Sequence, residues 1–192
     1  MIVELPCWDA PESGIPPELY HLRGHELVWD TPLYDVRVEG EELVVAGAAR
    51  VRGVFRSETQ PVADAVLTTA TGKQVRADSV LPGGVPVSDS RDGAEANLAG
   101  FEARFRLRDL ADADPPQDRQ PPVVWIAEIG WSAPSLRRTG RPTRLVGQRP
   151  GPLLSTLALP GVVIDAWFDA DRGLRVELRR RPSEPTQTNG LG

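Results

Sequence analysis

The sequence has little of the chemistry from which many familiar sites are built. It contains one cysteine, Cys7, and two histidines, His21 and His25. One cysteine rules out an internal disulfide framework and a zinc site that needs two thiolates. No apolar run approaches the roughly 20 residues that span a bilayer, and the first residues lack the basic and apolar regions of a signal peptide. We therefore expect no membrane span and a cytoplasmic location.

Positive charge is scarce and is almost entirely arginine. The chain has 22 Lys and Arg against 27 Asp and Glu, a formal net charge of −5, and Lys73 is its only lysine. A net acidic chain is a poor general nucleic-acid binder, because such binding needs clustered cations to neutralise phosphates. We expect no nucleic-acid partner, and the preference for arginine is typical of the GC-rich coding of a high-GC bacterium.

Glycine and proline are abundant, at 18 and 19 residues of 192. Such usage is well above the ordinary and disfavours a helical bundle. The length fits one domain, or one with a small appendage. A globular chain of this size buries about 70% of its unfolded surface, so it can fold without a disulfide or a metal.

Short segments that read as β-strands recur along the chain, separated by glycine- or proline-containing turns. The clearest is 101–108, where Phe101, Ala103, Phe105 and Leu107 alternate with charged residues. No strand is followed by a convincing amphipathic helix, although 109–113 can form one helical turn. The pattern predicts an all-β protein, an antiparallel two-sheet β-sandwich of the Ig-like kind. The expected strands are 36–38, 43–46, 64–69, 74–78, 101–107, 123–131, 143–146, 162–168 and 174–178.

The composition also divides the chain. Prolines interrupt residues 1–26, which we expect to form an irregular N-terminal arm. The β-sandwich is expected over 27–147. Residues 148–178 are interpreted as a connector and a C-terminal β-hairpin that packs on the sandwich, and 179–192 as a disordered tail.

Motifs for metals, cofactors and catalysis are weak. His21 and His25 have the i, i+4 spacing of helical zinc ligands, but Gly24 and nearby prolines argue against that helix. Asp169, Asp171 and Gly173 resemble the start of a calcium loop, yet hairpin turn chemistry explains them as well. The sequence has no Gly-x-Ser-x-Gly elbow and no glycine-rich phosphate loop. We expect no metal, no cofactor and no catalytic residue, while the many carboxylates leave an acid pair open.

Tryptophan and arginine offer the better candidates for binding. Trp125 and Trp167 are interpreted as core residues, whereas Trp131 stands near a strand end and is expected to be exposed, where an indole can stack on a sugar. Arginines cluster from 137 to 149 and can bind phosphate through their guanidinium groups. The alternative is a solvated strand edge. The candidate ligand-binding residues are Trp131, Arg137, Arg138, Arg141 and Arg144.

Four short motifs occur in an order that resembles a known family. They are Val-Arg-Gly-Val at 51–54, Thr-Gly-Lys at 71–73, Gly-Phe-Glu-Ala-Arg-Phe-Arg-Leu at 100–107 and Arg-Arg-Thr-Gly at 137–140. This order resembles accessory β-sandwich modules of bacterial cell-wall (teichoic-acid-type) glycosyltransferases and CDP-glycerol glycerophosphotransferases.

The resemblance implies a non-catalytic module in cell-envelope polymer synthesis. It would bind or position a glycan, an anionic polyol-phosphate polymer or a partner glycosyltransferase. One alternative is a protein–protein scaffold that pairs through an edge strand. A second is a small hydrolase based on two carboxylates.

Overall fold

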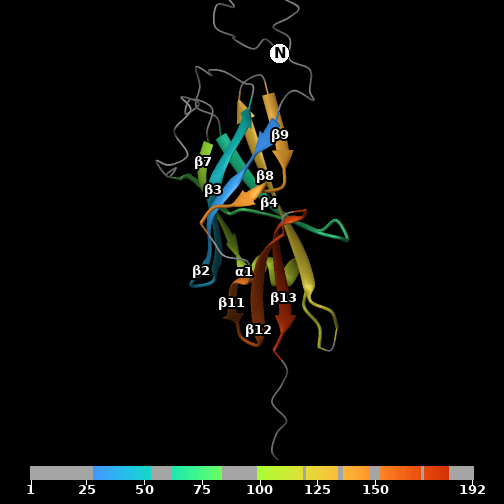
Figure 1. Ribbon diagram of the computed structural model, residues 1–192. Coiled ribbons are helices and arrows are strands. Elements are labelled where there is room, and N and C mark those ends of the chain that lie inside the picture. The colour runs from blue at the N-terminus through green and yellow to red at the C-terminus, as the bar shows by residue number, and fades with distance from the viewer. Residues whose placement is uncertain are drawn as a thin grey trace, which may run out of the picture.

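A computed structural model describes residues 28–52, 62–83, 99–118, 120–133, 136–147, 152–169 and 171–181 (Figure 1). Within these ranges the chain is an all-β sandwich of two sheets with one short helix, as the sequence predicted. The expected N-terminal arm, with Cys7, His21 and His25, lies outside the described residues. So do most of the expected loop at 82–98 and the tail beyond 181.

The first sheet has six strands in the described residues, and it is antiparallel apart from one short pair. Its strands run in the order β10-β2-β3-β7-β6, with β1 pairing with the far end of β3. Arg144 and Leu145 of β10 run parallel to Pro32 and Leu33 of β2. The strands are β1 (Val28–Asp30), β2 (Pro32–Glu39), β3 (Glu42–Arg52), β6 (Ser79–Pro82), β7 (Ala99–Arg106) and β10 (Arg144–Leu145).

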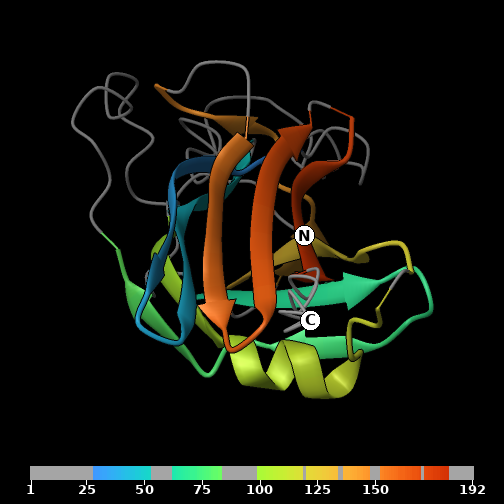
Figure 2. The ribbon, with the colours of Figure 1, turned by 90° about the horizontal axis from the view of Figure 1, so that it is seen from below.

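The second sheet has seven antiparallel strands in the same ranges. They run in the order β11-β12-β13-β8-β4-β5, and β9 pairs with the far end of β8. Figure 2 shows β11, β12 and β13 side by side, crossing the direction of β4, so this sheet is strongly twisted. The strands are β4 (Val62–Thr69), β5 (Gln74–Arg76), β8 (Val123–Ala133), β9 (Leu136–Gly140), β11 (Pro152–Leu159), β12 (Val162–Asp169) and β13 (Gly173–Arg180).

Inward-facing side chains of the two sheets form one buried cluster. Phe101 and Phe105 of β7 and Trp125 and Ile129 of β8 are each at most 1% exposed. Helix α1 (Leu107–Ala113) closes one end of the sandwich in Figure 2 and adds Leu107 and Leu110 to the cluster. The period-two alternation of the sequence is therefore the pattern that fills the interior.

The chain changes sheets between β5 and β6, which the sequence did not reveal. The backbone N–H of Ala77 donates to the carbonyl of Ala65 in the second sheet at 3.0 Å. The next N–H, of Asp78, donates to the carbonyl of Arg104 in the first sheet at 2.8 Å. Consecutive residues thus bond to opposite layers, and the strand expected over 74–78 ends at Arg76, before the chain enters β6 at Ser79.

The C-terminal segment extends the second sheet. Strand β13 pairs with β8 from Arg175 to Leu178 and continues to Arg180, past the expected start of the tail. The first part of the segment contains an unexpected strand, β11, which pairs with β12 and has register shifts near both ends. Its sequence, Pro-Leu-Leu-Ser-Thr-Leu-Ala-Leu, lacks the polar–apolar alternation by which the other strands were recognised.

Gly47 provides a test of the packing between strands. A Cβ at this position would lie 2.6 Å from the backbone oxygen of Pro32 and 3.0 Å from Cζ of Phe101. We expect Gly47→Ala to lower the free energy of unfolding by about 1–3 kcal/mol, as overpacking does in other cores. Denaturant unfolding followed by circular dichroism measures the change.

Gly40→Asn is the matched control. Gly40 has a φ of +60° and no atom within 4 Å of a built Cβ, and asparagine tolerates that backbone conformation. Equal losses of stability in the two variants would contradict the steric explanation for Gly47.

Candidate functional site

Trp131 is buried, and the expectation that its indole is exposed was wrong. It is 1% exposed and belongs to the core cluster. Strand β8 does not end at Trp131 but runs to Ala133, and β9 pairs beside it, with Arg138 opposite Trp131. The indole therefore fills the interior and offers no face to a sugar.

Arg137 and Arg138 lie on opposite faces of β9, because successive residues of a strand alternate. Arg138 shares the face of Trp131, its cross-strand neighbour. Arg137 is on the outer face, where its Nη2 donates to Oδ2 of Asp64 at 2.8 Å. Asp64 is the cross-strand neighbour of Gly130, and a Cβ built on Gly130 would collide with the Asp64 carboxylate. The Arg-Arg-Thr-Gly motif is thus part of strand β9, and its two arginines do not form one patch.

Arg141 and Arg144 lie where the chain passes from the second sheet to the first. The indole N–H of Trp29 donates to the backbone oxygen of Arg141 at 3.0 Å, and the Arg141 side chain is exposed. Nε of Arg144 lies 3.8 Å from Oδ1 of the buried Asp30. Asp30 also accepts hydrogen bonds from Arg50 and Thr143. These contacts tie the segment that follows β9 of the second sheet to β1 and β10 of the first sheet.

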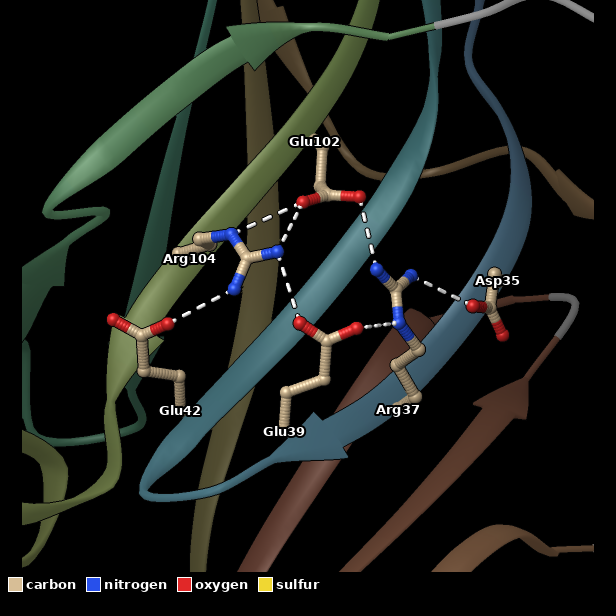
Figure 3. Close-up of polar contacts among 6 residues, drawn as sticks. All are labelled: Asp35, Arg37, Glu39, Glu42, Glu102 and Arg104. Atoms are coloured by element: carbon tan, nitrogen blue, oxygen red, sulfur yellow. Dashed lines mark hydrogen bonds and ion pairs between the residues drawn. The ribbon is translucent and has the colours of Figure 1, made fainter.

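A network of carboxylates and guanidinium groups covers the outer face of the first sheet (Figure 3). Arg37 binds Glu39 at 2.6 Å through Nε and Glu102 at 2.9 Å through Nη2, while its Nη1 binds Asp35. Arg104 binds Glu102, Glu42 and Glu39 in the same way. Each guanidinium thus uses all three of its nitrogens within this acid–arginine network.

The acid–arginine network also covers apolar surface. Val44 lies between Arg37 and Arg104 in the register of β2, β3 and β7, and it is fully buried although it faces outward. Its cover comes from the stems of long charged side chains. The alternation of the sequence predicted a charged outer face but not these partners, which depend on strand register.

The network shifts the ionisation of its members. Hydrogen bonds from Arg37, and next from Arg104, hold the pKa of Glu39 and of Glu102 below their ordinary value of 4.5. The same bonds raise the pKa of both arginines. With its donors already used by carboxylates, this face has the properties of a stabilising surface and not of an anion site.

The outer face of β12 and β13 carries a second group of polar residues that the sequence analysis missed. Trp167 lies on this face, not in the core as expected, and the guanidinium of Arg175 stands 6.0 Å from its ring centre. Two residues further along the same face, the buried Asp165 and Glu177 are cross-strand neighbours. Arg175 donates a hydrogen bond to Glu177. The alternation of 162–168 could have placed Trp167 on the same face as Asp165.

A shallow depression lies next to this row. Its volume is about 330 Å³, and it is lined by Ser155, Thr156, Leu157, Val163, Arg179 and Arg181. Asp165 lies beside it, accepting a hydrogen bond from Ser155 Oγ at 2.5 Å and one from Arg179 Nε at 2.7 Å. No motif in the sequence points to this site, because its residues come from three strands.

In the part of the chain that the structure describes, no three His, Cys, Asp or Glu side chains gather as a metal ion would require. The Asp169 carboxylate accepts a hydrogen bond from the backbone N–H of Asp171, as in an Asx turn. None of the described helices has the length and hydrophobicity to cross a bilayer.

Comparison with known proteins gives a likeness in fold. No family model and no curated protein matches the sequence. Among solved structures, S. aureus TarS matches with a TM-score of 0.51 at 11% identity, over 81% of this chain and 25% of that one. The 217–571 fragment of TarS matches with the same score and identity, over 82% of this chain and 40% of the fragment. The chain thus spans less than half of either structure.

TarS is a teichoic-acid glycosyltransferase. At 11% identity the likeness shows the fold alone. It supports a β-sandwich that corresponds to a region of TarS and does not establish the family.

Two tryptophans test the assignment of the faces. We expect Trp131→Ala to cost about 3–5 kcal/mol of unfolding free energy, because it empties a fully buried site. Trp167→Ala removes the same side chain from the outer face and should cost clearly less. Guanidinium unfolding curves of both variants measure this difference, and a larger loss for Trp167→Ala would refute the assignment.

The acid–arginine network predicts a pH dependence of stability. Because the folded state lowers the pKa of Glu39 and Glu102, the unfolded chain binds more protons as the pH falls. The stabilisation is complete above the ordinary value of 4.5 and is lost as the pH drops through the lower folded values. We expect Glu102→Gln to flatten the dependence of unfolding free energy on pH below 4.5, measured by urea unfolding.

Asp118→Asn is the matched control, since it removes an exposed carboxylate from the loop after α1. The same flattening in both variants would show that the network is not its source. High salt should reduce the difference between wild type and Glu102→Gln, because exposed charges are screened.

Proposed function

We propose that the chain is a non-catalytic β-sandwich module that binds or positions an anionic polyol-phosphate or glycan polymer in cell-envelope polymer synthesis, in the cytoplasm. The observation that carries the proposal is the TarS likeness, which covers four fifths of this chain and only a part of the enzyme. A partial match of this kind is what an accessory module would give. A partner glycosyltransferase belongs to the same proposal.

The surface chemistry favours an anionic polymer over a neutral one. Of the candidate residues from the sequence, Trp131 is buried, so a stacking platform for a sugar is missing there. Arg137 and Arg141 keep exposed side chains, and guanidinium groups bind phosphate through paired hydrogen bonds. Arg138 lies on the face of Trp131 and Arg144 lies beside the buried Asp30, so the exposed pair Arg137 and Arg141 carries the proposal.

Isothermal titration calorimetry with poly(glycerol phosphate) tests the proposal, with dextran as a neutral polymer. We expect saturable binding of the charged polymer that weakens at high salt. The double variant Arg137→Gln, Arg141→Gln should bind several-fold more weakly, because each charge-assisted contact contributes more than a neutral one. Absence of binding to both polymers by the folded protein would overturn ligand recognition.

Arg76→Gln is the matched control for charge. Arg76 is exposed on β5, at the edge of the second sheet opposite β11. The proposal also holds that the chain has no turnover of its own. Hydrolysis of either polymer by the purified protein would favour the carboxylate alternative, for which the adjacent buried pair Asp165 and Glu177 is the candidate.

A second candidate function is a scaffold that pairs through an edge strand. Strand β11 is at the edge of the second sheet, its eight residues carry no charge, and Leu157 is 54% exposed. Natural edge strands usually carry charges that prevent pairing with another chain. A specific complex that Leu157→Lys abolishes, in the absence of polymer binding, would favour this function.

A further inference from the structure

We propose that the depression beside β11, β12 and β13 is an oxyanion site that takes a phosphate group attached to a small carbon chain, such as a phosphate ester of a polyol. The site is distinct from the arginines at 137–144. It deepens the proposed function, on which it rests for the nature of the natural ligand. Binding of phosphate itself follows from the local chemistry alone.

The lining combines the groups that such a ligand needs. Arg179 and Arg181 supply guanidinium donors, and Thr156 supplies a hydroxyl group. Leu157 and Val163 supply apolar surface against which carbon atoms can pack. The volume of about 330 Å³ is at the lower end of the range for ligand pockets, roughly 300–1,000 Å³. A small phosphate ester fits this size better than a long glycan segment.

Asp165 holds Arg179 in place. Its carboxylate is buried and binds Nε of Arg179 at 2.7 Å, while Ser155 donates to its other oxygen. Arg179 nevertheless keeps 46% of its side chain exposed and lines the depression. The Nη groups of an arginine held through Nε are left to face a ligand, and a fixed guanidinium loses less entropy on binding.

The backbone positions Arg181 at the rim. Its N–H donates to the carbonyl of Gly161 at 2.8 Å, which extends the β12–β13 pairing by one residue. Arg179 and Arg181 are two apart on one strand path and therefore share a face. Among the described residues, Asp165 is bonded to Arg179 and Ser155, and Glu177 is bonded to Arg175.

Arg179 differs from the arginines of the acid–arginine network in the number of its nitrogens that bind carboxylates. Arg37 and Arg104 each bind carboxylates through three nitrogens. Arg179 binds one carboxylate through one nitrogen in the described residues. An added phosphate would have to displace carboxylates at the first pair and would only add bonds at Arg179. This difference selects the depression.

The test is NMR titration of the ¹⁵N-labelled full chain with inorganic phosphate, glycerol 3-phosphate and glycerol. We expect saturable shifts confined to residues 155–157, 163 and 179–181 with both phosphates, tighter for glycerol 3-phosphate, and none with glycerol. Arg181→Gln should weaken binding about tenfold, the cost of one charge-assisted hydrogen bond. Arg76→Gln should leave it unchanged.

Arg179→Gln is the second variant, and its fold must be checked because it leaves Asp165 without its cation. Arg181→Gln keeps that ion pair and so tests the site without this complication. Absence of saturable shifts, or equal weakening by Arg76→Gln, overturns the site. Polymer binding that Arg181→Gln leaves intact would retain the proposed function and reject this inference. Phosphate binding in the depression without polymer binding would support this site and reject the proposed function.

Discussion

Packing between the inward rows of β7 and β8 is the constraint on which the rest of the structure depends. Phe101 and Phe105 face inward from one sheet, Trp125 and Trp131 from the other, and all four are buried in one cluster. Because strands alternate with a period of two, fixing these rows inward also fixes which residues face outward. The acid–arginine network and the depression occupy the two outer faces that this packing creates.

The same alternation shows how far the sequence could predict the site. It correctly predicted the two-sheet sandwich, the hairpins and the burial of Trp125. The alternation also places Trp131 on the same face as Trp125, and Trp167 on the same face as Asp165, because residues an even number of positions apart on a strand share a face. Local cues misled the interpretation: a position near an expected strand end suggested exposure for Trp131, and the apolar residues around Trp167 suggested burial. Where the alternation along a strand and the neighbouring residues disagree, the alternation is the stronger physical signal.

Features that depend on distant partners were not predictable from one sequence. Strand β10 lies within the strand expected over 143–146, but its parallel pairing with the start of β2 was not predictable. Strand β11 has no alternation, and its partner β12 is what makes it a strand. Arg137 and Arg138 are adjacent in sequence, yet pairing of β9 with β8 sends them to opposite faces. A cluster along the chain becomes a cluster in space only when strand register permits it.

Arginine has two different roles on the surfaces of this sandwich. On the first sheet, alternating acids and arginines satisfy one another and bury Val44 beneath them. On the second, a buried aspartate holds Arg179 by one nitrogen, and nearly half of that side chain stays exposed. A carboxylate that binds one guanidinium nitrogen orients the arginine, whereas several carboxylates that bind all three nitrogens neutralise it. Recognition of an anion requires the first arrangement, so the number of partners per guanidinium, and not the number of arginines in a stretch of sequence, indicates where a phosphate can bind.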